Sequence, residues 1–297
     1  MSARTRSILA FILVTMIWGS TWSVIKDQIS VVPAQWSVTW RFALATVGMA
    51  LLAKWRGEDL RLGPGGYRFA AMLGLLQFCL NFQFVYQAQH HLTSGVVAVL
   101  FALLMVPNAV LARLFLNTPV SGRFIEGGAV AIAGIGLLLT HEYAVAPVGG
   151  SVLLGLVLAS LAIMCASGAN VLLATDTARK LPAVSLLAWA MLFGTLFDAA
   201  LALAMTGPPA FDSRPEYWWG IAYLGILGSV VTFPLYFALI RNWGPGPAAY
   251  NGVAVPVVAM ALSTLLEGYH WTALAAGGAA LAMVGLLIAL SGRKAGG

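Results

Sequence analysis

Ten apolar segments, each long enough to cross a lipid bilayer, run through the chain with short connections between them. An α-helix rises 1.5 Å per residue, so about 20 apolar residues span the roughly 30 Å hydrocarbon core. The segments do not alternate polar and apolar residues, as the strands of a membrane β-barrel would. We therefore predict an all-α integral membrane protein with ten transmembrane helices. The predicted spans are 8–26, 34–53, 68–88, 94–112, 123–140, 151–173, 184–206, 217–239, 246–265 and 272–291.

The composition excludes a soluble protein. Only 9% of the 297 residues are charged and the mean hydropathy is +0.89, whereas a soluble domain has about 25% charged residues. The spans leave no room for a soluble catalytic domain. The first span is expected to be retained, because it contains Trp18 and Trp22 and no small-residue cleavage site follows it, unlike a signal peptide.

The basic residues predict the orientation. Thirteen of the sixteen Lys and Arg residues fall in loops on one side, Lys26 and Arg214 fall on the other, and Arg41 lies within a span. Basic loops stay in the cytoplasm, so both termini are predicted to be cytoplasmic, in a multi-pass protein of the cytoplasmic (inner) membrane. The net charge of +6 then reflects topology, and we expect the lipid bilayer as a partner and no nucleic acid.

An internal repeat divides the chain. Shifting the sequence by 149 residues superimposes Trp40 on Trp189 and Pro107 on Pro256 without a gap. We therefore predict two five-helix repeats, 1–148 and 149–297. Five is an odd number, so the second repeat enters the membrane with the opposite orientation. Secondary transporters use inverted repeats of this kind, with the substrate near the midplane where the repeats meet.

Several motifs resemble those of EamA-type transporters in the drug/metabolite transporter superfamily. The matching stretches are W-G-S-T-W (18–22), N-F-Q-F-V-Y-Q-A (81–88), Y-F-A-L-I-R-N-W-G-P (236–245), A-V-P-V-V-A (254–259) and L-L-E-G (265–268). The resemblance implies ten helices and the export of small metabolites, and within the family the chain looks closest to the aromatic amino-acid exporter branch. Thr118 takes the first-half position that matches Glu267, so any role of that glutamate is not duplicated.

Polar and aromatic residues inside the spans are the candidate substrate contacts. Trp18 lies near the predicted midplane, where it forms either a cavity wall or part of the packing. The third span carries five amide or phenol groups within eleven residues, which either line a wet central cavity or hydrogen-bond between helices. The candidate substrate-binding residues are Trp18, Thr21, Gln77, Asn81, Tyr86, Asn108, Asn170, Tyr250 and Asn251.

Two charges and two prolines lie deep in the spans. Arg41 and Asp198 are expensive to place in a membrane, which makes them functional candidates. They pair with each other, or Asp198 relays protons, or Arg41 extends its long side chain outward to the interface. Pro107 and Pro256 each free a backbone carbonyl, so each is a candidate hinge or a static kink.

No metal site, cofactor or catalytic residue is expected, and the protein is predicted not to be an enzyme. His90 and His91 are adjacent and point apart on a helix, and no phosphate-binding loop or nucleophile motif is present. Small residues in the fifth and tenth spans favour close packing within a monomer over a dimer.

The sequence favours a secondary transporter that exports small amphipathic metabolites by alternating access, with amino acids, including aromatic ones, as the favoured class. A drug or organic-cation exporter is the alternative, although it should need several deep carboxylates and Asp198 is a single one. An intramembrane enzyme is the alternative from another class.

Overall fold

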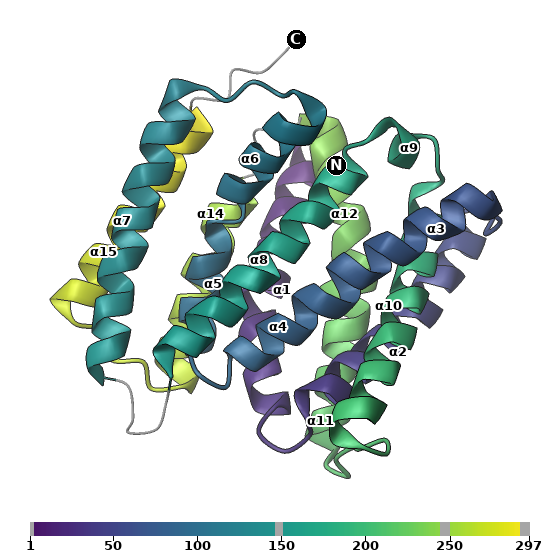
Figure 1. Cartoon of the computed structure of the whole chain (residues 1–297), viewed down its shortest axis with the longest axis horizontal. Coiled ribbons are helices and arrows are strands. Elements are labelled where there is room, and N and C mark those ends of the chain that lie inside the picture. The colour runs from purple at the N-terminus through teal and green to yellow at the C-terminus, as the bar shows by residue number, and fades with distance from the viewer. Residues whose placement is uncertain (1–2, 146–150, 244–249, 292–297) are drawn as a thin grey trace.

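The computed structural model describes residues 3–145, 151–243 and 250–291, and all regular structure in these ranges is helical (Figure 1). In chain order the elements are α1 (Ala3–Gln28), α2 (Ala34–Trp55), α3 (Gly63–Leu73), η1 (Gly74–Leu80), α4 (Asn81–Ala88), α5 (Ser94–Ala102), α6 (Met105–Leu116), α7 (Gly122–Val145), α8 (Val152–Leu173), α9 (Asp176–Arg179), α10 (Ala183–Thr206), α11 (Pro215–Ala222), η2 (Tyr223–Val231), α12 (Thr232–Trp243), α14 (Asn251–Leu266) and α15 (Ala273–Ser291).

Within these residues, nine helical segments are long and apolar enough to cross a membrane. The span predicted at 246–265 corresponds to the 16-residue apolar helix α14, which begins at Asn251. The Gly-Pro pair at 244–245 and the basic residues Arg293 and Lys294 lie outside the described residues. The all-helical prediction is therefore confirmed for the described chain, while the count of ten spans stays a prediction.

Two composite spans contain π-helical turns at equivalent positions of the repeat. The first consists of α3, η1 and α4, and the second of α11, η2 and α12. The segment η1 begins at Gly74 and η2 begins at Tyr223, which is the shift of 149 residues found in the sequence. π-helical turns are rare overall and occur preferentially at functional sites. The two halves therefore share an unusual backbone geometry as well as a sequence pattern.

The two candidate hinge prolines lie in different local structures. The helix is interrupted between α5 and α6, where Leu103 and Leu104 form a turn just before Pro107. A proline cannot donate to the carbonyl four residues earlier, and the Leu103 carbonyl instead accepts from the Val106 amide at 2.8 Å. Pro256 lies inside the continuous helix α14. The hinge role of both prolines stays a prediction.

The equivalent helices α2 and α10 pack against each other and run antiparallel. Glu58, just beyond the end of α2, accepts hydrogen bonds from the amides of Val184 and Ser185 at 3.0 and 3.1 Å, at the beginning of α10. Helices related by an inverted repeat must be antiparallel where they meet, so this packing agrees with two oppositely oriented halves.

The fifth and tenth spans, α7 and α15, lie side by side at one edge of the molecule (Figure 1). A Cβ atom on Gly134 would lie 2.3 Å from the Ala282 amide nitrogen, and one on Gly127 would lie 2.5 Å from the Gly285 carbonyl oxygen. Glycine therefore allows the two backbones to touch, and Gly285 faces α7 as expected for packing within one chain. Gly136 has open space around it and takes no part in this contact.

The two halves also exchange equivalent hydrogen bonds. The Trp40 indole on α2 donates to the Ala210 carbonyl at 2.8 Å, and the Trp189 indole on α10 donates to the Leu60 carbonyl at 2.7 Å. Each tryptophan thus anchors the loop of the opposite half.

We call the end of the bundle where α1 ends and α2 begins the outer end; α1 begins and α15 ends at the opposite end (Figure 1).

Candidate functional site

The polar residues of the third span are buried against protein. Asn81, Gln83 and Tyr86 on α4 are each less than 5% exposed. Gln83 donates to a carboxylate oxygen of Asp198 at 2.8 Å, and the Tyr86 hydroxyl donates to the side-chain oxygen of Gln28 at 3.4 Å. Tyr86 and Gln83 therefore join α4 to α1 and α10 in the outer half of the bundle.

Unpartnered polar atoms gather in the same region. The Asn81 amide donates to the Gln77 carbonyl at 3.3 Å, but the side-chain oxygens of Gln77, Asn81 and Gln83 have no hydrogen-bond partner, nor has the side-chain nitrogen of Gln28. A buried polar group without a partner is costly in an apolar environment. Such a cluster fits a place that water or a polar solute occupies.

Arg41 and Asp198 lie at similar depth on the packed helices α2 and α10. Arg41 is seven residues after Ala34 at the start of α2 and Asp198 is eight residues before Thr206 at the end of α10, which is about 10 Å from each outer end. Within the described residues, Arg214 with Asp212 is the single ion pair found. Arg41 is also only 3% exposed, so this structure shows neither the Arg41–Asp198 pair nor an arginine extended to the interface.

Trp18 is held in the wall between α1 and α12. Its indole N–H donates to the Thr232 hydroxyl at 2.9 Å, and its ring lies against Phe233 and Tyr236, with centroids 5.8 and 5.2 Å away. Thr21 is buried beside it and donates its hydroxyl hydrogen to the Trp18 carbonyl at 2.7 Å. These aromatic rings form a half-buried apolar surface in which the polar edge of Trp18 is already bonded.

The remaining candidates form separate interhelical contacts. Asn170 on α8 lies 3.4 Å from Asn108 on α6, and Asn251 on α14 donates to the Thr15 hydroxyl at 2.8 Å. Tyr250, beside Asn251, is 40% exposed. The predicted residues therefore form at least three groups, and the asparagines of α6, α8 and α14 make hydrogen bonds between helices.

A polar cluster at the outer end was not predicted. The Lys26 ammonium donates to the carbonyls of Gln89 and Leu92, and the Glu267 carboxylate accepts from both the amide, at 3.0 Å, and the hydroxyl of Ser94. Glu267 follows α14 and Ser94 begins α5, so this cluster joins α1, α5 and α14. The sequence pattern placed Glu267 near a helix end but carried no signal for a partner 173 residues away.

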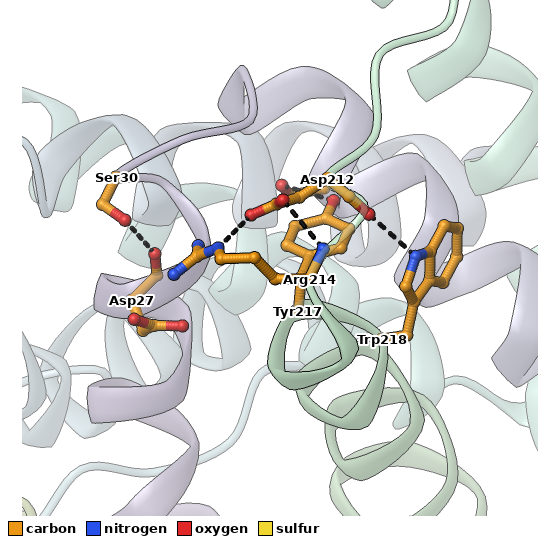
Figure 2. A network of polar contacts seen from close by, with 7 residues as sticks. Asp27, Ser30, Asp212, Arg214, Tyr217 and Trp218 are labelled. Atoms are coloured by element: carbon orange, nitrogen blue, oxygen red, sulfur yellow. Dashed lines mark hydrogen bonds and ion pairs between the residues drawn. The ribbon is translucent and has the colours of Figure 1, made fainter.

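A second outer network orders the connection between α10 and α11 (Figure 2). Arg214 contacts Asp212 at 2.5 Å, and the Trp218 indole donates to the Asp212 carbonyl at 2.9 Å. Hydrogen bonds from the backbone and side chain of Arg214 hold the pKa of the Asp212 carboxyl below its usual range. The Tyr217 hydroxyl is 3.0 Å from the Ser37 hydroxyl on α2, so this network fixes α11 on α2.

Two hollows lie outside the polar cluster. An apolar one of about 630 Å³ lies among α5, α14 and α15, with Pro256, Met260 and Trp271 in its wall. A polar one of about 490 Å³ lies near the inner ends of α6 and α8, lined in part by Thr118 and Arg179. Apart from Pro256, the predicted site residues line neither hollow, and the predicted central cavity stays a prediction.

Two similar halves of apolar helices with buried polar side chains define a multi-pass integral membrane protein built from a repeat. The chain belongs to the EamA-like transporter family, whose sequence model matches it twice, at residues 5–140 and 153–291. The two matches confirm the repeat, while the boundary between 148 and 149 stays a prediction. The protein is thus a transporter of the drug/metabolite transporter superfamily.

Relatives agree with this assignment. The chain is 25% identical over 269 residues to protein PagO of Salmonella typhimurium, covering 88% of this chain and 85% of PagO. It is 28% identical over 257 residues to the uncharacterized inner membrane transporter YedA of Escherichia coli, covering 85% and 80%. A solved crystal structure, 17% identical, superposes with a TM-score of 0.69 over 97% of both chains, which shows a shared fold.

Proposed function

We propose that this protein is a secondary transporter of the inner membrane that exports small amphipathic metabolites, with amino acids, including aromatic and other apolar ones, as the main class. It has ten transmembrane helices in two inverted repeats and cytoplasmic termini, and it works by alternating access around a central cavity between the repeats. The observation that carries this proposal is the set of buried, partly unpartnered polar groups on α1, α2, η1 and α4.

The chemistry of this cluster supports an amphipathic solute. Gln28, Gln77 and Asn81 each have one side-chain amide atom without a partner. The Phe82 ring beside Arg41 and the ring of Trp18 contribute apolar surface. In hydrocarbon, polar side chains must find partners, and a solute with one polar and one apolar end would supply both kinds of contact.

The arrangement of the halves supports alternating access. The tryptophan contacts from α2 and α10 to the loops of the opposite halves are nearly symmetric, so they can persist while the two halves exchange conformations. The Glu267–Ser94 contact has no counterpart, because Thr118 replaces the glutamate in the first half. Symmetric contacts suit a pivot, and an asymmetric contact suits a gate that closes one end.

The name of YedA, an inner membrane transporter, supports the same membrane for this protein. The organic-cation alternative is less well supported, because Asp198 already accepts a hydrogen bond from Gln83 and no second deep carboxylate lies beside it in the described spans. The intramembrane-enzyme alternative would need a nucleophile with a matched base.

A counterflow assay tests the proposal. Purified protein in liposomes loaded with an unlabelled solute should accumulate the same labelled solute for amino acids, and most strongly for apolar ones. Quaternary ammonium ions and sugars form the comparison panel, and empty liposomes are the control. Accumulation of the ammonium ions alone would establish the organic-cation alternative, and chemical conversion of an added solute would indicate an enzyme.

A further inference from the structure

The Arg41 guanidinium is buried and enclosed by aromatic rings. Its side chain extends from α2, and its guanidinium carbon lies 4.4 Å from the centroid of the Phe82 ring and 5.2 Å from that of Phe42. Arg41 is 3% exposed. Cation–π contacts of this kind hold a guanidinium in place, but ring faces leave its N–H groups free to donate to another partner.

Two of the three guanidinium nitrogens lack a partner. Both Nε and Nη1 of Arg41 are buried without a hydrogen bond. They lie on different edges of the guanidinium, and each shares its edge with Nη2, so each of the two edges that can bind a carboxylate in a bidentate manner carries a donor without a partner. The Tyr86 hydroxyl is near enough to interact with the guanidinium. Tyr86 also contacts Gln28, whose side-chain nitrogen is a further donor without a partner.

No carboxylate of the described residues forms an ion pair with Arg41. In the described residues no acidic group lies within 4.0 Å of Arg41, and Asp198 is hydrogen-bonded to Gln83 instead. A buried cation without an anion is unfavourable, because burial removes its hydration. An anionic ligand would restore the missing interactions.

We propose that Arg41 binds the carboxylate of the transported solute, so that the protein recognises monoanionic carboxylate groups, with the Gln28 amide and the Tyr86 hydroxyl as neighbouring polar contacts. This inference rests on the proposed function, because it assumes that the solute reaches the polar cluster. A guanidinium edge matches the two oxygens of a carboxylate. The nearby Phe42 and Phe82 rings then lie where the apolar part of an amphipathic carboxylate begins.

The experiment compares solutes that differ only at the carboxylate. Thermal stabilisation and counterflow are measured for purified wild-type protein with phenylalanine, phenylalanine amide and phenethylamine. Removing the carboxylate should weaken the apparent affinity at least about tenfold, the effect of a lost charged hydrogen bond. Benzoate, which has a carboxylate and no ammonium group, should compete with phenylalanine.

Variants then assign the effect to Arg41. In Arg41→Gln the preference for the carboxylate should disappear, and Arg41→Lys should restore it in part, because a lysine keeps the charge but not the bidentate edge. Arg68→Gln, at an exposed position of α3, is the matched control and should behave as the wild type. Where Arg41→Gln does not fold, the partial loss of the carboxylate preference expected for Arg41→Lys takes its place, and an unchanged preference in Arg41→Lys would overturn the role of Arg41.

The outcomes separate this inference from the proposed function. Equal affinity for phenylalanine and its amide, with transport of both, would overturn the role of Arg41 and leave export intact. Stabilisation by benzoate that Arg41→Gln abolishes, without amino-acid transport, would support the carboxylate site and overturn the choice of substrate. A carboxylate preference that persists in Arg41→Gln would also overturn the inference.

Discussion

At the residue scale, single side chains in this protein combine an apolar body with a bonded polar edge. Trp18 contacts Phe233 and Tyr236 through its ring and bonds Thr232 through its N–H group. A tryptophan that is anchored in this way presents a fixed apolar surface, since its ring cannot rotate without breaking the bond. The sequence could predict that Trp18 lies deep in the first span, but not that its partner is 214 residues away.

We expect Trp18→Ala to reduce the transport of large apolar amino acids by about tenfold while small polar ones change less, because the substitution removes contact area from the wall. The measurement is counterflow with a series of side-chain sizes. Trp18→Phe is the control, which keeps a ring but removes the N–H donor. A uniform loss over all solutes, together with a lower melting temperature, would place Trp18 in packing alone.

At the element scale, the helices follow from the length of the apolar segments, since within the described residues each predicted span falls on one helix or on consecutive helical elements. The π-helical turns did not follow, because no residue pattern in the sequence indicates a wider turn. The wider turns at 74–80 orient Gln77 differently relative to Asn81 than a regular α-helix would. The sequence therefore identified the polar span but not which of its atoms are in contact.

The polar face of this span should be accessible to water. In a background without Cys79 and Cys165, we expect a cysteine at position 77 to react with a water-soluble thiol reagent several times faster than a cysteine at position 75. Leu75 is 36% exposed on the outside of the bundle, where lipid would surround it. An excess of substrate should slow the reaction at 77, and equal rates at both positions would argue against a cavity beside η1.

The beginning of α10 depends on a residue from the other half. Because Glu58 accepts from two α10 amides, Glu58→Ala should lower stability by about 1 kcal/mol, as loss of a helix N-cap does. Thermal unfolding of the purified protein measures this change. Asp59→Ala is the control, since among the described residues Asp59 bonds only the nearby Arg61 amide. A similar melting temperature for both variants would contradict a capping role for Glu58.

At the scale of the whole molecule, two nearly symmetric halves are joined by an outer cluster that is not symmetric. Lys26, Ser94 and Glu267 connect α1, α5 and α14 at the outer end. The repeat itself was visible in the sequence because a shift of 149 residues aligns rare residue types. The cluster was not visible, because it depends on which helix ends meet in three dimensions. The proposed alternating access assigns this cluster to closing the outer end and the packing of α2 on α10 to the pivot.

We therefore expect Glu267→Gln to favour opening of the outer end. The carboxylate contributes charged hydrogen bonds to the start of α5, and losing about 1.4 kcal/mol changes the ratio of two conformations about tenfold. A cysteine at position 77 should then react severalfold faster with a reagent added from the outside than it does with Glu267 in place. Glu216 is an exposed acidic residue at the start of α11. The control variant Glu216→Gln should leave the rate unchanged.

If Glu267→Gln lowers the melting temperature without changing the labelling rate, the carboxylate serves as a helix cap and not as a gate. If the rate rises with an unchanged melting temperature, the interaction differs between the conformations, which is the property that a gate requires.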